Sequence, residues 1–232
     1  MKNIFIYIKI LTTSFIFIFF ISSYVYTCTT RQNTLLNKIN YFNKCIEIII
    51  NIDHKIFKLI NSTLKCRTLD YFIIILNFIY NLTKFHYSFT ILIIIISILI
   101  LWKYKKHNFC FNVCIFIVVL TISTISNYIC KFLCARARPI TRLGIENVNT
   151  ILENSLYNSF PSGHTQIAVT ICTFMLFIIN KYRLLYIITT VLIGLERIYV
   201  GSHFPSDVIA GALLGMLITY FILIVLKYFY RL

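Results

Sequence analysis

The chain has 232 residues, of which 59% are hydrophobic and only 12% are charged. This balance is far from that of a water-soluble domain, so we expect a lipid bilayer to surround most of the chain. The formal net charge of +15 would suggest nucleic acid in a soluble protein. Here the cations lie mostly at the ends of apolar runs, where they can reach lipid headgroups, and no nucleic-acid partner is expected.

The N-terminal part, residues 1–85, is predicted to hold one membrane helix and then an interfacial or extracytoplasmic segment. The apolar run from about residue 4 to 26 lacks a clear small-residue cleavage site, which favours a retained helix over a signal peptide. Residues 27–69 are mixed in polarity and suit a helix lying on the membrane surface. The apolar stretch 70–82 is short, which places it in the interface or under the bundle.

The remaining part, residues 86–232, is predicted to form an all-α core of membrane helices. A helix needs roughly 20 apolar residues to cross a hydrocarbon layer of about 30 Å. Runs of this kind cover residues 86–104, 109–132, 164–180, 183–200 and 207–229. Together with the N-terminal run they predict a polytopic bundle of about six transmembrane helices.

Cations mark one end of this predicted bundle. They occur in short breaks after alternate spans and comprise Lys103, Lys105, Lys106, Lys181, Arg183, Lys227 and Arg231. By the positive-inside rule these breaks face the cytoplasm, so residues 27–85, 133–163 and 201–206 share the other face. We therefore predict an integral protein of the bacterial inner (plasma) membrane whose second face lies in the periplasm or exterior, or in a lumen if the source is eukaryotic.

The eight cysteines do not indicate a metal site. Those in or beside apolar runs are interpreted as small core residues, namely Cys110, Cys114, Cys130 and Cys172, and no pair has the spacing of a zinc site. Three others follow the first apolar run, Cys28, Cys45 and Cys66, and a disulfide among them is left open.

Three clusters of polar residues fall on the second face. The first comprises Lys131, Arg136 and Arg138 before Pro139, and predicts a helix that ends in cations and is stopped by proline. Alone, such a cluster is typical of a helix anchored in headgroups.

The second cluster, Pro161 to His164, opens a span. Ser162 can cap the helix, Gly163 permits close approach of the backbone, and N–H groups at a helix start can hold an anion. By itself this segment is a common turn and helix start.

The third cluster runs from Arg197 through His203 to Asp207. Pro205 suits the first position of a helix and places Asp207 in the first turn, where the helix dipole favours a carboxylate. Together the clusters supply cations, helix starts and two histidines around one point, an arrangement suited to stabilising a transferring phosphoryl group.

The order and spacing of these clusters resemble the three-part signature of the type 2 phosphatidic acid phosphatase superfamily, in its membrane-bound branch. The resemblance covers roughly residues 86–229. One departure is Glu196, where the family often has serine; a carboxylate there is expected to pair with a basic neighbour or to face another helix.

The resemblance implies a role for each matching residue. The phosphate oxygens would be bound by Lys131, Arg138, Ser162, Gly163 and Arg197, with Arg136 as an auxiliary cation. His203 would be the nucleophile, Asp207 would orient its ring, and His164 would serve as general acid and base. No metal or cofactor is expected, since the seven carboxylates form no pair suited to holding magnesium.

The predicted function is hydrolysis of a phosphomonoester or diphosphate on a membrane lipid, through a phosphohistidine. Candidate substrates are phosphatidic acid, phosphatidylglycerol phosphate, undecaprenyl diphosphate and lipid A. Two alternatives stay open: a lipid phosphotransferase on the same scaffold, and a catalytically inactive lipid-binding membrane protein. The sequence does not indicate an oligomeric state.

Overall fold

The computed structural model of the chain describes residues 40–71, 73, 88–151 and 155–230. Every regular element in these residues is a helix, which confirms the predicted all-α class for the described part. The predicted first span at residues 4–26 lies outside the described residues, as does most of the stretch 70–82.

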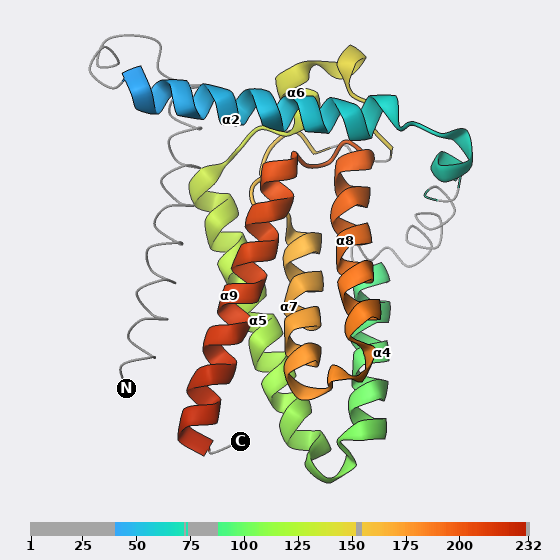
Figure 1. Cartoon of the computed structure of the whole chain (residues 1–232), viewed down its shortest axis with the longest axis vertical. Helices are drawn as coiled ribbons and strands as arrows, with labels where there is room; N and C mark the ends of the chain where they lie inside the picture. The colour runs from blue at the N-terminus through green and yellow to red at the C-terminus, as the bar shows by residue number, and fades with distance from the viewer. Residues whose placement is uncertain (1–39, 72, 74–87, 152–154, 231–232) are drawn as a thin grey trace.

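Five helices run lengthwise through the molecule and alternate in direction (Figure 1). Their bounds fall close to the predicted spans: α4 (Ser88–Tyr104), α5 (Phe109–Cys134), α7 (Gly163–Ile178), α8 (Arg183–Tyr199) and α9 (Pro205–Tyr230). At the lower end of Figure 1, η3 (Lys106–Asn108) joins α4 to α5, and η5 (Asn180–Tyr182) joins α7 to α8. Short turns of this kind make sequence neighbours antiparallel.

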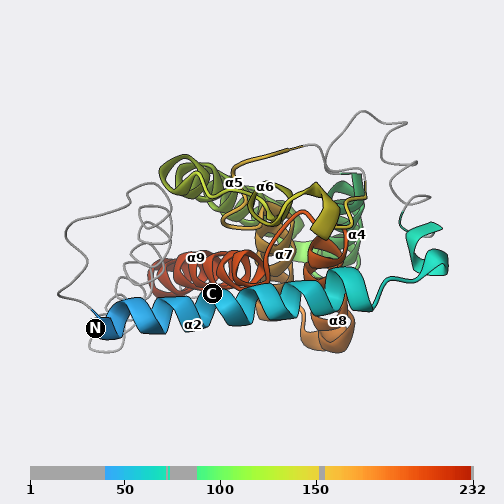
Figure 2. The same cartoon turned by 90° about the horizontal axis from the view of Figure 1, so that it is seen from above.

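The upper end of the bundle carries the longer connections. Helix α2 (Asn40–Lys58) lies across the ends of the long helices and continues into the π-helix η2 (Leu59–Thr63), as Figures 1 and 2 show. The short elements α6 (Pro139–Leu143) and η4 (Ile145–Asn147) lie at the same end. The connections that were predicted to share one face therefore lie at the same end of the bundle, as far as the structure describes them.

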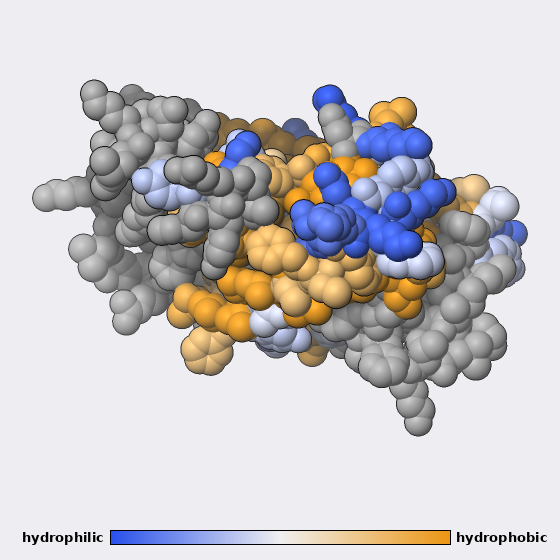
Figure 3. All heavy atoms as spheres, turned by 90° about the horizontal axis from the view of Figure 1, so that it is seen from below, coloured by the Kyte–Doolittle hydropathy of each residue, from blue (hydrophilic) through white to orange (hydrophobic). Residues whose placement is uncertain are grey.

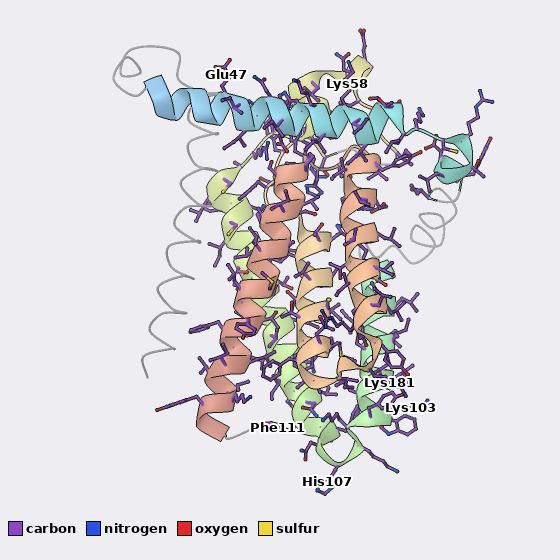
Figure 4. All side chains as sticks on the ribbon, in the orientation of Figure 1. Glu47, Lys58, Lys103, His107, Phe111 and Lys181 are labelled. Atoms are coloured by element: carbon purple, nitrogen blue, oxygen red, sulfur yellow. The ribbon has the colours of Figure 1, made fainter. Side chains whose placement is uncertain are left out.

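The cations of the short turns lie at the opposite end. Lys103, His107 and Lys181 lie there (Figure 4), and the view from below shows a patch of hydrophilic side chains bordered by apolar surface (Figure 3). The end that carries α2 is basic as well, since it holds Lys58 (Figure 4), Arg136 and Arg138, so the orientation in the membrane stays a prediction.

Helix α2 presents a buried face and an exposed apolar face. Asp53 and Phe57 are buried against the bundle, whereas Ile48, Ile52 and Ile56 are exposed. An exposed apolar stripe on a helix that crosses the end of a bundle suits the boundary between headgroups and acyl chains. A helix lying on the membrane surface was predicted within residues 27–69; α2 is a helix in this range, and its contact with the membrane surface stays a prediction.

Two stretches of the described residues, Lys106–Leu143 and Pro205–Tyr228, have the length and apolar composition of a membrane span. Two shorter apolar helices cover Leu92–Tyr104 and Gly163–Ile178. The total of six spans thus stays a prediction.

Polar side chains connect α5 to α7 inside the bundle. The Asn127 amide donates to Gln166 Oε1 at 2.7 Å, and Gln166 Nε2 donates to the Ser123 carbonyl at 2.7 Å. One turn further, the Ser123 and Thr170 hydroxyls are 2.8 Å apart. Hydrogen bonds of this kind hold membrane helices together because lipid offers their donors and acceptors no alternative partner.

The small-residue stripe of α9 packs directly on α7. A Cβ at Gly211 would lie 2.4 Å from the Ser162 carbonyl oxygen, and one at Gly215 would lie 2.4 Å from that of Gln166. This close approach at Gly211 and Gly215 brings the starts of α7 and α9 together.

The cysteine prediction is partly wrong. Cys130 and Cys172 are buried as expected, but Cys110 and Cys114 are exposed. They lie four residues apart on α5, so they share the face that this helix turns away from its neighbours. Cys66 is a free thiol, while Cys28 lies outside the described residues.

Replacing Gly215 by alanine should destabilise the protein by about 1–3 kcal/mol, because the new methyl group overlaps backbone that must shift. Thermal unfolding in detergent measures the effect, with Met216→Leu on the exposed face of the same helix as the control. An unchanged unfolding temperature for Gly215→Ala would contradict the close contact between α7 and α9.

Candidate active site

The first cluster differs from its prediction at Pro139. Helix α5 already ends at Cys134, because Ala135 adopts a left-handed conformation with φ 39° and its N–H bonds to the Lys131 carbonyl. Pro139 is instead the first residue of α6. The prediction that proline stops the helix is therefore wrong, and Arg136 and Arg138 lie in the linker between the two helices.

Lys131 and Arg138 converge on one segment of the loop before α7. Lys131 Nζ donates to the Asn158 carbonyl at 2.6 Å, and Arg138 Nε donates to the Tyr157 carbonyl at 3.1 Å. The backbone N–H of Arg138 also bonds to the Leu156 carbonyl at 2.9 Å. Two cations predicted to bind phosphate thus bond to the same loop.

The second cluster forms the start of α7. Ser162 is the N-cap residue, but its buried hydroxyl bonds to that of Thr165 at 3.0 Å and does not cap a backbone N–H, so the predicted side-chain cap is wrong. At Gly163 a Cβ would lie 3.2 Å from Asn127 Oδ1, which confirms the close approach. His164, the second residue of α7, is half-buried.

The third cluster forms the start of α9, which begins at Pro205 with Asp207 in its first turn, as predicted. The Ser162 N–H donates to the Asp207 carbonyl at 3.0 Å, which joins the second cluster to the third. Asp207 Oδ2 also accepts from the Phe204 N–H at 2.8 Å, so the carboxylate closes the first turn of its own helix.

His203 lies against this carboxylate. Its Nδ1 is 3.8 Å from Asp207 Oδ2 and 3.5 Å from Ser159 Oγ, while the Ser159 hydroxyl donates to Asp207 Oδ2 at 2.5 Å. The Nδ1 side of the ring therefore faces Asp207 and Ser159, which leaves Nε2 as the nitrogen for chemistry. Ser159 was not predicted, and only its place two residues before Pro161 could have suggested it.

The His203 ring is 3% exposed. Burial lowers its pKa to about 4; Asp207 opposes this shift, and the nearby charges of Arg138 and Lys131 add to it. The imidazole is thus neutral at physiological pH, which is the form that can act as a nucleophile.

Arg136 does not match its predicted role as an auxiliary phosphate cation. It is buried, with Nη1 2.5 Å from Asp207 Oδ1 and Nη2 2.9 Å from Asp53 Oδ2. Nη1 also donates to the Ser206 hydroxyl at 2.7 Å. The guanidinium forms ion pairs with two carboxylates, because a buried charge needs oppositely charged partners. It therefore holds Asp207 in place and does not point at a phosphate.

Asp53 of α2 is a second residue that the sequence did not reveal. It comes from a segment 83 residues before Arg136, and its helical phase, one turn before Phe57, is the only sequence signal that places it on the buried face.

Arg197 lies in the last turn of α8 and is paired with Glu196, since Nε and Nη2 donate to the two oxygens of that carboxylate. The expectation that Glu196 faces a basic neighbour is confirmed. Arg197 must break its ion pair with Glu196 before it can bind a phosphate.

Comparison with known proteins agrees with this site. The PAP2 superfamily matches residues 112–231, a stretch that contains all three clusters, and the chain belongs to this family. The bacitracin transport permease protein BcrC of Bacillus licheniformis is 40% identical over 79 residues, or 34% of this chain and 38% of that protein. An undecaprenyl-diphosphatase of Sulfolobus acidocaldarius is 35% identical over 106 residues, or 45% of this chain and 50% of that protein.

The matched segments thus span half or less of these two curated relatives. Among solved structures, LpxE of Aquifex aeolicus shares 31% identity with a TM-score of 0.58, and the match covers 74% of this chain and 94% of that one.

The burial of His203 predicts a pH dependence of stability. Below about pH 6.5 the unfolded chain takes up a proton on this ring, whereas the folded protein keeps it neutral down to about pH 4. The free energy of unfolding should therefore fall as pH falls through this window, by at most about 1.4 kcal/mol per pH unit. Thermal unfolding in detergent of wild type and His203→Gln should diverge below about pH 6.5; parallel curves would contradict burial of the neutral ring.

Proposed function

We propose that the chain is an integral membrane phosphatase that hydrolyses a phosphomonoester or diphosphate on a lipid through a phosphohistidine. The observation that carries the proposal is the buried neutral His203, whose Nδ1 faces Asp207 at the start of α9 near Lys131 and Arg138. Membership of the PAP2 superfamily supports it.

In the first step, His203 Nε2 attacks phosphorus as the bond to the lipid oxygen breaks. The electron pair of that bond leaves with the lipid oxygen, and His164 donates the proton that oxygen needs. Asp207 and Ser159 hold the Nδ1 side of the ring, so the imidazolium that forms carries its positive charge beside a carboxylate.

In the second step, His164 removes a proton from water as the water oxygen attacks phosphorus. The phosphorus–nitrogen bond breaks, its electron pair returns to Nε2, and inorganic phosphate leaves. Lys131, Arg138, the backbone at Ser162 and Gly163, and Arg197 once released from Glu196 would bind the phosphoryl oxygens in both steps. The cycle consumes one water and regenerates both histidines.

A lipid substrate fits the position of the site. The cations and His203 lie at one end of a bundle whose long helices expose apolar side chains such as Ile117 and Ile125. A lipid can then reach the cations with its headgroup while its chains stay in the bilayer. Undecaprenyl diphosphate is one candidate, since a relative is named undecaprenyl-diphosphatase; phosphatidic acid, phosphatidylglycerol phosphate and lipid A are the others.

We further propose six membrane spans, with the site on the periplasmic or exterior face of the bacterial inner membrane. The support for this orientation is that the short turns at the end opposite the site carry Lys103 and Lys181 (Figure 4), although Lys58 lies at the site end.

Purified protein in detergent, with chelator present, should release inorganic phosphate from at least one lipid phosphate. Because His203 forms the covalent bond, His203→Ala should lower the rate by at least about 10³-fold. Transfer of phosphate to a second lipid without release into water would establish a phosphotransferase. Absence of both from the wild type would favour a lipid-binding protein.

His164→Ala should lower the rate by about 10²–10⁴-fold, the usual contribution of a general acid and base. Since water activation is also lost, the variant should accumulate phosphorylated His203 when given a lipid with a good leaving group. Radiolabelled phosphate that stays with the protein in base and is lost in acid measures this species. A variant with wild-type turnover would contradict the assignment.

A further inference from the structure

Arg136 bridges two carboxylates that come from opposite parts of the chain. One is Asp207, which faces His203, and the other is Asp53, contributed by α2. All three charged residues are buried, at 8% exposure or less. The proposed mechanism uses Asp207 and has no place for Asp53.

The balance of charge around Arg136 suggests a role for Asp53. A guanidinium 2.5 Å from Asp207 would by itself cancel the negative charge that His203 needs when its ring becomes cationic. Asp53 lies 2.9 Å from the other terminal nitrogen of the same guanidinium. The group of three therefore carries one net negative charge, and Asp207 is the member of the group that faces His203.

Asp53 also holds the start of α9. Its Oδ1 accepts the Ser206 N–H at 2.8 Å and its Oδ2 accepts the Ser206 hydroxyl at 2.6 Å. The residue before Pro205 is Phe204, which has no side-chain acceptor to cap the helix. A carboxylate from α2 thus supplies the cap of the helix that bears Asp207.

Aromatic contacts fix α2 in this place. The Phe204 ring lies 5.4 Å from Phe57 and 5.3 Å from His54, and Arg136 stacks on it at 4.7 Å. Asn61, just beyond α2, donates to the carbonyls of Asn149 and Tyr199 at 2.8 Å. The position of Asp53 is therefore set by packing as well as by charge.

We propose that Asp53 is a positioning residue for the reaction: it neutralises Arg136, so that the charge of Asp207 stays available to His203. This inference rests on the proposed phosphohistidine chemistry. It makes α2, a helix outside the family match at residues 112–231, part of the machinery that sets turnover.

The test replaces Asp53 by asparagine, which keeps the shape and removes the charge. We expect kcat to fall about tenfold, with KM within about twofold, because the loss arises when the ring becomes cationic and not when lipid binds. Asp53→Glu, which keeps the charge, should recover most of kcat. The matched control is Asp70→Asn, since Asp70 bonds to the Tyr199 hydroxyl at 2.6 Å and has no contact with Arg136.

A double-mutant cycle separates this role from simple capping of α9. If Asp53 acts through Arg136, Asp53→Asn should lower kcat less than about threefold in an Arg136→Gln background. If it only caps α9 or docks α2, the loss should be the same in both backgrounds, and the proposal is overturned. Should Asp53→Asn fail to fold, Asp53→Ser, whose hydroxyl can still accept from Ser206, carries the same test.

Nitrogen-15 NMR of His203 in detergent keeps the inference separate from the proposed function. Asp53→Asn should reduce the population of the Nδ1–H tautomer, because Asp207 becomes a weaker acceptor, and Asp70→Asn should not. If the wild type has no phosphatase activity but Asp53→Asn still shifts the tautomer of His203, the proposed function is refuted and the coupling between Asp53 and His203 is retained. An active wild type whose kcat and tautomer are unaffected by Asp53→Asn would refute the coupling alone.

Discussion

A buried guanidinium needs carboxylates to balance its charge, and this requirement organises the upper end of the molecule. Arg136 cannot leave water without carboxylates, and it finds one on α2 and one on α9. The linker after α5, the surface helix and the last helix of the bundle are thereby held to one point. One of these three charges, Asp207, faces His203, so the interaction that assembles this end of the fold also borders the candidate site.

The close packing of α9 on α7 is the second constraint, and the glycines of α9 permit it. At Gly211 and Gly215 the backbone of α9 lies against the backbone of α7, which no larger side chain would permit. As a result the Ser162 N–H reaches the Asp207 carbonyl, and two motifs about 40 residues apart become one site. On the other side of α7, Asn127 and Gln166 fix the distance to α5, which carries Lys131.

The environment of His203 shows how opposite charges are used for different purposes. Lys131 and Arg138 lie near the ring, and together with burial they keep it neutral and nucleophilic. Asp207 and Ser159 occupy the Nδ1 side of the ring. Cations and a carboxylate thus act on one buried ring, in surroundings where each interaction is stronger than in water.

The sequence by itself determined the helical class, the bounds of the long helices and the residues of the three clusters. Apolar runs of fixed length define helices in a bilayer, and short motifs such as that around His203 and Asp207 keep their spacing when a helix starts at proline. Only the tertiary structure decided the partner of Arg136, the place of Ser159 beside His203, and the entry of Asp53 from α2. These contacts join residues far apart in the chain, and local periodicity carries no information about which buried charge will meet which. Ala135 adds a local example, because a left-handed turn at alanine ended α5 before the proline that the sequence had indicated.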